Sequence, residues 1–324
     1  MSDFDPIVSS DDREAWLAAR REGITATDAV KILLPGPRGT PTSVLAAKMG
    51  IEDDLDPDEY LLWLGREMEE VCRRRFNKEA KDGPEEGYRV WRYAQKWGVL
   101  VRNRWHKWLL ATLDAEVDEL PVDGAMSKTG LEIKYSGLSS DWTDGVPRYV
   151  WIQVQHQMLV THKPWWYVAA MLHRSFVWAR VERDDEYLTG VHLPALREFR
   201  KRQKLGTPMP EDGFKPTLAA LRKMYLEERD EPVLLDGEWV EVDMERCSVV
   251  EQIAALTEKR DALNARLRAV MGNATRAVLP SGIEYTLKAN VRGSRVPGGG
   301  GSDDRPRELR EPALRRPAAD HRAD

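Results

Sequence analysis

Polar and apolar residues alternate strictly along residues 129–136, the stretch that best organises the chain. Leucine, isoleucine and tyrosine are separated there by Glu132, Lys134 and a serine. This period of two predicts a half-buried β-strand. Side chains two positions apart point to the same face of a strand, so Glu132 and Lys134 lie side by side. Taken alone, this pair is also typical of a surface ion pair, which contributes little to stability.

A second strand is predicted over residues 105–117, with Asp114 near its end. Residues 118–128 contain Pro121 and Gly124 and are expected to form a connecting turn. The two strands would then pair as a hairpin, which can bring Asp114 beside Glu132. Two converging carboxylates repel each other unless a cation is bound, and Mg²⁺ is typically held by one or two carboxylates. A neighbouring lysine can orient or deprotonate a water for attack on phosphorus.

Two predicted helices carry further polar residues that could join the candidate site. Residues 59–76 form an amphipathic helix whose apolar face is flanked by Glu69, unless Glu69 simply pairs with Arg73 one turn on. Residues 149–161 suit a helix that carries Gln153 and Gln155. Further helices are expected over 11–20, 28–34, 42–48, 193–205 and 215–228, and further strands over 87–93, 98–103, 165–172 and 176–182.

The composition of the chain changes around residue 232. Residues 249–271 repeat apolar side chains at alternating steps of four and three, interrupted by Arg260, which predicts a coiled-coil or helical-hairpin seam. A β-hairpin is expected over 277–291, and a disordered tail from residue 297. The sequence therefore predicts a domain over 1–232, a helix-plus-hairpin appendage over 233–296 and a disordered tail over 297–324.

Charge and cysteine usage narrow the class of protein. The net charge of −5 does not indicate a nucleic-acid binder, but residues 61–110 hold twelve Lys and Arg against seven Asp and Glu. A local positive excess can dock a polyanion, although these bases can equally well solvate helix faces. Two distant cysteines exclude a disulfide scaffold, a zinc cluster and a four-cysteine iron–sulfur site. No long apolar run or secretion leader is visible, so we expect a cytoplasmic protein with no membrane partner.

Four motifs, in order, resemble a known family. They are residues 23–28 (GITATD), residues 65–69 (GREME), Asp114 followed by Glu132-x-Lys134, and residues 149–158 (YVWIQVQHQM). Over about residues 13–185 the chain resembles the YqaJ-like viral recombinases, which include phage lambda-type exonuclease, within the PD-(D/E)XK nuclease superfamily. The family usually has proline before its aspartate and glycine after it, whereas Leu113 and Ala115 stand here. Glu116 and Asp118 therefore remain alternatives to Asp114.

The resemblance implies an α/β (α+β) restriction-endonuclease-like core, in which helices flank a mixed central sheet. It also implies that Asp114 and Glu132 hold Mg²⁺ or Mn²⁺ with the Ile133 backbone carbonyl, and that Glu69 completes the shell, directly or through water. Lys134 would position or activate the attacking water. Gln153 would steady it, with Gln155 as the fallback.

In the family, the segment near the start contacts the terminal phosphate of DNA. By the motif, Arg20 is the phosphate-binding arginine and Thr27 stands in the position of a serine, with Arg21 as the alternative in register. The other interpretation is a helix-capping threonine beside a solvated arginine.

The function implied by the resemblance is a metal-dependent 5′→3′ exonuclease acting on linear double-stranded DNA. Such an enzyme leaves 5′-phosphate products and 3′ single-stranded tails for a single-strand annealing protein. Relatives form a ring trimer, which suggests a homo-oligomer. A restriction-like endonuclease and a catalytically inactive DNA-binding or scaffold protein are the alternatives, because a fold alone does not separate them.

Overall fold

The computed structural model describes residues 4–51, 59–80, 82–85, 88–121, 125–136, 140–173, 175–226, 230–281 and 284–286. The chain divides into two compact units, Met1–Glu228 and Arg229–Asp324. This division lies close to the boundary that the sequence predicts at residue 232, and the predicted tail from residue 297 lies outside the described residues.

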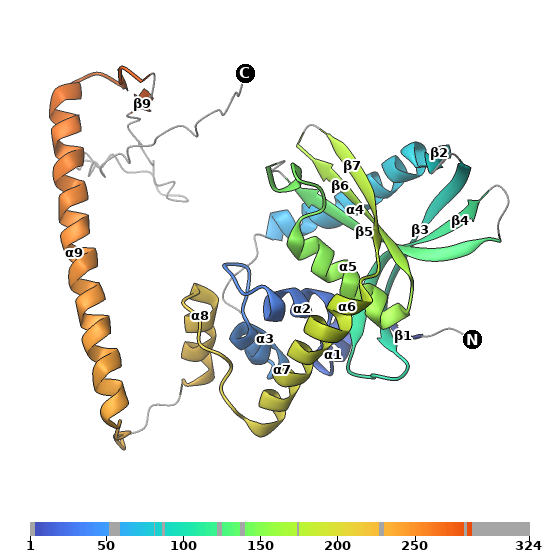
Figure 1. Ribbon diagram of the computed structural model, residues 1–324, viewed down its shortest axis with the longest axis horizontal. Coiled ribbons are helices and arrows are strands. Elements are labelled where there is room, and N and C mark those ends of the chain that lie inside the picture. The colour runs from blue at the N-terminus through green and yellow to red at the C-terminus, as the bar shows by residue number, and fades with distance from the viewer. Residues whose placement is uncertain are drawn as a thin grey trace, which may run out of the picture. The chain divides into compact units, whose positions relative to one another are not determined.

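The first unit is built on a seven-stranded mixed sheet of order β1-β3-β4-β5-β6-β7, with β2 paired to β3 at the side (Figure 1). Among the strand pairs of the described residues, β5–β6 is the parallel one, and α5 lies in the connection between these two strands. The predicted α/β core, a mixed sheet flanked by helices, is confirmed. In order, the elements are β1 (Phe4–Ser9), α1 (Arg13–Arg21), α2 (Ala26–Leu33), α3 (Pro41–Lys48), α4 (Glu59–Glu79), β2 (Asp82–Glu85), β3 (Tyr88–Asn103), β4 (Leu110–Pro121), β5 (Ser127–Ser136), η1 (Ser140–Trp142), α5 (Arg148–Thr161), β6 (Trp165–Leu172), β7 (Phe176–Glu182), α6 (Asp185–Tyr187), η2 (Leu188–His192), α7 (Leu193–Leu205) and α8 (Lys215–Met224).

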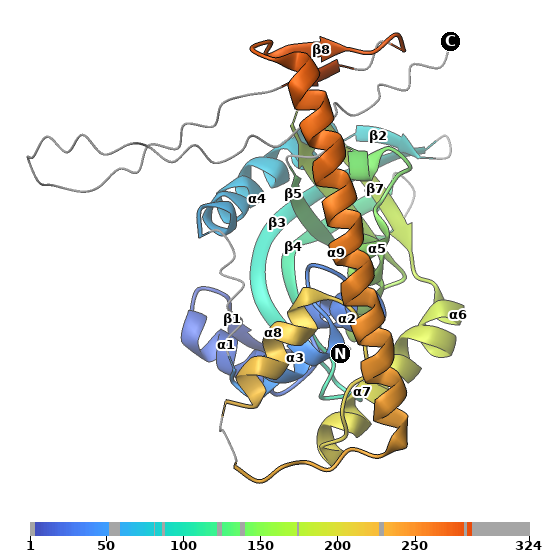
Figure 2. The same cartoon turned by 90° about the vertical axis from the view of Figure 1, so that its left-hand side faces the viewer.

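Two apolar clusters hold helices against opposite faces of this sheet (Figure 2). On one face, Cys72 and Phe76 of α4 pack against Ala115, Leu131 and Tyr167 of the central strands. On the other face α5 is buried almost throughout, and α2 lies against both α5 and α7. The polar residues of β5 and α5 thus face one another across a largely dry interior.

One close approach explains a glycine in the central strand. A Cβ built on Gly130 would lie 1.8 Å from Cζ2 of Trp166, whose side chain is buried on the neighbouring strand β6. Any larger residue at position 130 would displace this indole, so the strand that carries Glu132 needs glycine two residues before it.

Several predicted boundaries are wrong. The two strands expected over 87–93 and 98–103 are one strand, β3, which continues through an irregularity between Lys96 and Val99. The turn expected over 118–128 is mostly strand, because β4 continues to Pro121 and β5 begins at Ser127. Residues 105–109, expected in a strand, precede β4, and β1 was not predicted at all. The proline and the acidic residues of 118–121 suggested a turn, but this stretch is held by pairing to β3.

The second unit contains one long helix and a small hairpin. Helix α9 spans Gly237–Met271, and β8 (Arg276–Val278) pairs antiparallel with β9 (Glu284–Thr286). The predicted helix and hairpin are both present. The helix is longer than the heptad pattern alone indicated, because its start at Asp236, a capping aspartate, lies well before Val249.

Candidate active site

The site begins where two strands separate. β4 pairs with β5 from Ala115, opposite Leu131, to Glu119, opposite Ser127, while β5 continues beside β6 as far as Ser136. Asp114 is the first β4 residue past this ladder. Its Oδ2 accepts a hydrogen bond from the backbone N–H of Ile133 at 2.9 Å. The carboxylate thus takes the place of a strand acceptor and is fixed beside Glu132.

A β-bulge marks the same position on the other side of β4. Lys96 pairs with Ala115 and Val99 pairs with Leu113, so that two residues of β3 stand opposite Asp114 alone. One of them is Gly98, with φ of 63°, a conformation that favours glycine. A bulge bends and twists the strand that carries it. The bulge therefore coincides with the position at which β4 leaves β5.

Glu132 is the centre of a buried hydrogen-bond cluster. Its Oε1 accepts from Lys134 Nζ at 2.5 Å and from Gln153 Nε2 at 2.6 Å. Lys134 Nζ also donates to Gln153 Oε1 at 2.9 Å, which closes a triangle between β5 and α5. Because only 2 % of Glu132 is exposed, these donors replace the water that a carboxylate would otherwise need.

Gln157 also contacts this carboxylate, and sequence reasoning gave it no role. It is fully buried one helical turn after Gln153, and its Nε2 donates to Glu132 Oε2 at 2.5 Å. The same nitrogen lies 3.4 Å from the Thr112 carbonyl oxygen of β4. The four-residue spacing from Gln153 is the signal that could have identified it.

Burial and like charge raise the proton affinity of the acids. Burial, and then the negative charges of Glu132 and Glu69, raise the pKa of Asp114 well above its usual value. The pKa of Glu69 is raised for the same reasons, by burial first and then by Glu132. Burial alone would lower the pKa of Lys134, but the charges of Glu132 and Asp114 outweigh it and raise this pKa. One lysine among three acids leaves an excess of negative charge that a bound cation would relieve.

The alternatives left open by the sequence lie elsewhere. Glu116 and Asp118 both bind Lys128, at 2.8 and 3.2 Å. Arg73 forms its ion pair with Glu70, at 2.7 Å, rather than with Glu69.

Gln155, the fallback for Gln153, is also directed away from Glu132. It donates to the Glu182 carbonyl oxygen and accepts from the Asp184 N–H, at 2.7 and 2.9 Å.

A second polar cluster surrounds Arg20. Its guanidinium lies 4.3 Å from the centre of the Trp16 ring and donates to Thr25 Oγ1 at 3.3 Å. Lys48 Nζ donates to Asp28 Oδ2 at 2.6 Å and to the Arg20 carbonyl oxygen at 2.7 Å. Burial lowers the pKa of Arg20, and the nearby Asp28 charge opposes this shift. Lys48 is a member of the cluster that the sequence did not indicate.

The N-cap of α2 shows which of two nearby threonines, Thr25 or Thr27, caps this helix. Thr25 caps the helix and forms a capping box with Asp28, so Thr25 is the cap and the helix begins at Ala26 rather than Asp28. Thr27 is exposed in the first turn of α2, and Arg21 is exposed at the end of α1. Of the three predicted phosphate-binding residues, only Arg20 joins this cluster through the contacts described.

Residues 15–164 match the model of the YqaJ-like viral recombinase domain. This segment is similar to the YqaJ-like viral recombinases. The predicted resemblance is thereby confirmed, and all four predicted motifs lie within the matched residues. The YqaJ-like match begins inside α1 and ends just before β6, so it contains every residue of both clusters.

The chain is also similar to individual proteins, at low sequence identity. The uncharacterized protein YqaJ of Bacillus subtilis (strain 168) is 24 % identical over 269 residues, covering 81 % of this chain and 79 % of its own length. The crystal structure of an alkaline exonuclease from Laribacter hongkongensis aligns with a TM-score of 0.44 and 19 % identity, covering 60 % of this chain and 93 % of that one. The crystal structure of SSO0001 aligns with a TM-score of 0.31 and 13 % identity, covering 62 % and 89 %.

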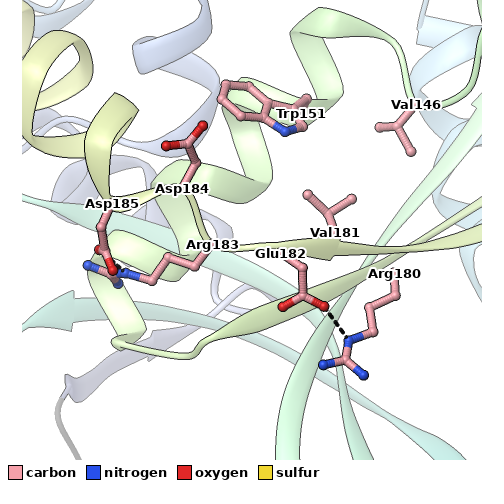
Figure 3. Close-up of a pocket in the computed structure, with 8 residues that line it drawn as sticks. All are labelled: Val146, Trp151, Arg180, Val181, Glu182, Arg183, Asp184 and Asp185. Atoms are coloured by element: carbon pink, nitrogen blue, oxygen red, sulfur yellow. Dashed lines mark hydrogen bonds and ion pairs between the residues drawn. The ribbon is translucent and has the colours of Figure 1, made fainter. Parts of the chain in front are cut away.

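A cavity of about 650 Å³ lies outside the two polar clusters (Figure 3). Trp151 of α5 and residues 180–185 line it, and Figure 3 shows two ion pairs among these side chains. Arg180 pairs with Glu182 at 2.8 Å, and Arg183 pairs with Asp185 at 2.6 Å. Both arginines of the lining are thus paired within the protein, and none of the predicted catalytic residues lines the cavity.

The site has too few protein ligands for a structural metal centre. Within the described ranges, no group of three or more His, Cys, Asp and Glu side chains could hold one metal ion. Two carboxylates remain adjacent, those of Asp114 and Glu132, and a Mg²⁺ site needs only one or two. The residues therefore fit a hydrated divalent ion better than a fully protein-coordinated one.

None of the helices in the described part of the chain is long and apolar enough to span a bilayer.

Proposed function

We propose that this chain is a metal-dependent exonuclease of phage recombination type that acts on the ends of linear double-stranded DNA. The observation that carries the proposal is the buried cluster at the separation of β4 and β5, where Lys134 and Gln153 both bind Glu132 beside Asp114. This combination of acids, lysine and glutamine lies within the residues that are similar to the YqaJ-like viral recombinases. The polarity we propose is 5′→3′, with 5′-phosphate products and 3′ single-stranded tails.

Mg²⁺, or Mn²⁺ in its place, is the proposed cofactor. Asp114 and Glu132 would hold it with the Ile133 carbonyl, and Glu69 would contact it through water. When bound, such an ion polarises the phosphodiester and stabilises developing negative charge. The excess of buried negative charge supports this assignment, because the pKa values of Asp114 and Glu69 are both raised by neighbouring carboxylates.

The remaining residues of the cluster have positioning tasks. Lys134 would position or activate the attacking water. Gln153 would hold the lysine and share the water, since it contacts Lys134 and Glu132 at once. A water held in line with the scissile bond needs fixed donors and acceptors, and two residues on different elements provide them.

Arg20 is the proposed contact for the terminal phosphate of the substrate, with exposed Thr27 or Arg21 beside it. The guanidinium is already oriented by Trp16 and Thr25. Duplexes with 5′-phosphate and 5′-hydroxyl ends would test this role, because Arg20→Met should remove the difference between them. If the variant still prefers one end chemistry, Arg20 does not bind the terminal phosphate.

The central experiment compares linear and closed circular duplex DNA in the presence of Mg²⁺. We expect only the linear form to be degraded, with a label at the 5′ end released first. Circles cut at fixed sites would indicate an endonuclease, and DNA that is bound but intact would indicate an inactive binding protein. Lys134→Ala should lower the rate by about 10²–10⁴-fold, as loss of a proton-transfer or water-positioning group does. Full activity of that variant would refute the proposed site.

Two partner proposals accompany this function. A single-strand annealing protein would take up the 3′ tails, and a homo-oligomer, a trimer by resemblance, would enclose the duplex. Co-purification with an annealing protein from the same source, and the mass of the purified protein in solution, test them separately.

A further inference from the structure

Helix α9 carries an apolar stripe along its whole length, and this stripe is exposed. Ile253, Leu256 and Leu263 are 59 %, 65 % and 47 % exposed, far more than such side chains are in a packed helix. Helices in proteins draw most of their stability from packing an apolar face against a partner. A helix of 35 residues with this stripe open to solvent therefore needs a partner.

The heptad repeat of this stripe extends over more of α9 than residues 249–271. Written as heptad positions a and d, it begins at Trp239 and ends at Val270, about 47 Å further along the helix at 1.5 Å per residue. All d positions are apolar, but arginine occupies two of the a positions. The a positions are Trp239, Arg246, Ile253, Arg260 and Leu267, and the d positions are Val242, Val249, Leu256, Leu263 and Val270.

The two arginines discriminate between orientations of a helix pair. In a parallel pair in register, each a residue faces its own copy, so Arg246 would meet Arg246 and Arg260 would meet Arg260. Like charges facing each other in the seam are destabilising. In an antiparallel pair, each a residue of one copy faces a d residue of the other. Setting Ile253 opposite Leu256 then fixes the partners in all the remaining layers.

This antiparallel register places each arginine opposite an apolar residue. Arg246 faces Leu263 of the second copy, and Arg260 faces Val249. The stems can pack there while the guanidinium groups stay at the edge. Each already has an acid on its own helix, since Arg246 binds Asp243 and Arg260 binds Asp261, at 2.9 and 2.7 Å.

The residues that flank the a and d positions also favour the antiparallel register. In the antiparallel register, the g position Glu245 lies opposite Arg266 of the second copy, and by symmetry the contact occurs twice. Gln252 lies opposite Lys259 in the same way. In a parallel pair, Glu245 would instead lie beside Val250, and Arg266 beside Met271, with no opposite charge.

We propose that α9 is a self-association element, which pairs antiparallel with α9 of a second copy of this chain in the register where Ile253 faces Leu256. The occupant of the exposed stripe is thus another α9. This inference is independent of the nuclease site, because none of its residues belongs to either cluster described above.

A charge exchange in the full-length protein tests both the pairing and its orientation. Glu245→Arg would set an arginine against Arg266 in both contacts, and Arg266→Glu would set a glutamate against Glu245 in both. Each single change should weaken association about tenfold, and the double variant should restore it, because the ion pairs re-form with reversed polarity. Glu251→Arg, at the outward position f, makes the same charge change as Glu245→Arg and should leave association unaffected.

Sedimentation velocity over a range of protein concentrations provides the measurement. Ile253→Asp should halve the mass of the associated particle, whatever assembly the first unit forms by itself. A wild-type protein whose mass Ile253→Asp does not change would overturn the pairing. A double variant as weak as the single ones would overturn the antiparallel register.

Discussion

Replacement of Gln157 by methionine provides the sharpest test of how the site is held together. The change keeps a flexible side chain of similar length but removes the amide that donates to Glu132 Oε2 at 2.5 Å. A hydrogen bond to a charged group contributes about 1.5–3 kcal/mol, so its loss at a buried carboxylate is substantial. Gln157 does not touch the proposed water, and its role is to position Glu132.

The expected effect has two parts. If Glu132 holds a divalent ion, losing a supporting hydrogen bond should weaken metal binding or activity by about 10–100-fold. The Mg²⁺ concentration for half-maximal DNA degradation should therefore rise, with a smaller loss of rate at saturating Mg²⁺. A residue that only stabilised the fold would lower the melting temperature without shifting this Mg²⁺ dependence.

Gln155→Met is the matched control. Gln155 is equally buried on the same helix, but its amide binds the backbone at Glu182 and Asp184. Both variants should lose a comparable amount of stability in thermal unfolding. Only Gln157→Met should change the Mg²⁺ dependence of degradation. If the two variants are equally impaired, or if Gln157→Met is indistinguishable from wild type, the positioning argument is refuted.

Three further predictions concern stability. Gly130→Ala should destabilise the fold by about 3 kcal/mol in chemical denaturation, because its Cβ would lie 1.8 Å from buried Trp166. Lys48→Met should cost about 3 kcal/mol, because it leaves the buried carboxylate of Asp28 without the ammonium at 2.6 Å. His156 should make the fold acid-sensitive, because burial lowers its pKa from 6.5 to about 4. The unfolded chain then binds this proton first, so about 3 kcal/mol of stability, present above pH 6.5, is lost as the pH falls toward 4.

Each of these predictions has a contrary outcome. Gly130→Ser should be at least as damaging as Gly130→Ala, and a tolerated serine would show that the indole can move. Asp28→Asn combined with Lys48→Met should recover most of the loss, since the uncompensated charge is then gone. For His156, the slope of melting temperature against pH should flatten in His156→Gln, and an unchanged slope would assign the acid sensitivity to other groups.

The residues of the proposed active site could be proposed from local pattern. Alternation along 129–136 placed Glu132 and Lys134 on one face, and the helical period placed Gln153 on a face of α5. The structure brings those three side chains together through hydrogen bonds of 2.5–2.9 Å. These relations need only strand and helix periodicity, together with the assumption that consecutive elements pack against each other.

What the pattern could not provide is the separation of β4 from β5. The predicted hairpin turn over 118–128 correctly joined two antiparallel strands, but it did not indicate that pairing stops at Ala115. That end coincides with the bulge at Gly98, contributed by a third strand that the sequence analysis divided in two. Non-local pairing decides such features, and no window of local sequence contains them.

The same reason explains why Lys48 and Gln157 were missed. Lys48 lies twenty residues from Asp28, on another helix, and its partnership with Asp28 appears only when α2 and α3 pack together. Gln157 lies among apolar residues of α5, where a glutamine is easily taken for a tolerated polar residue. Its position becomes meaningful because Glu132 lies opposite it with one oxygen still to be satisfied. A buried carboxylate requires a donor for each oxygen, so once Glu132 is placed under α5, the need for a residue such as Gln157 follows from its chemistry.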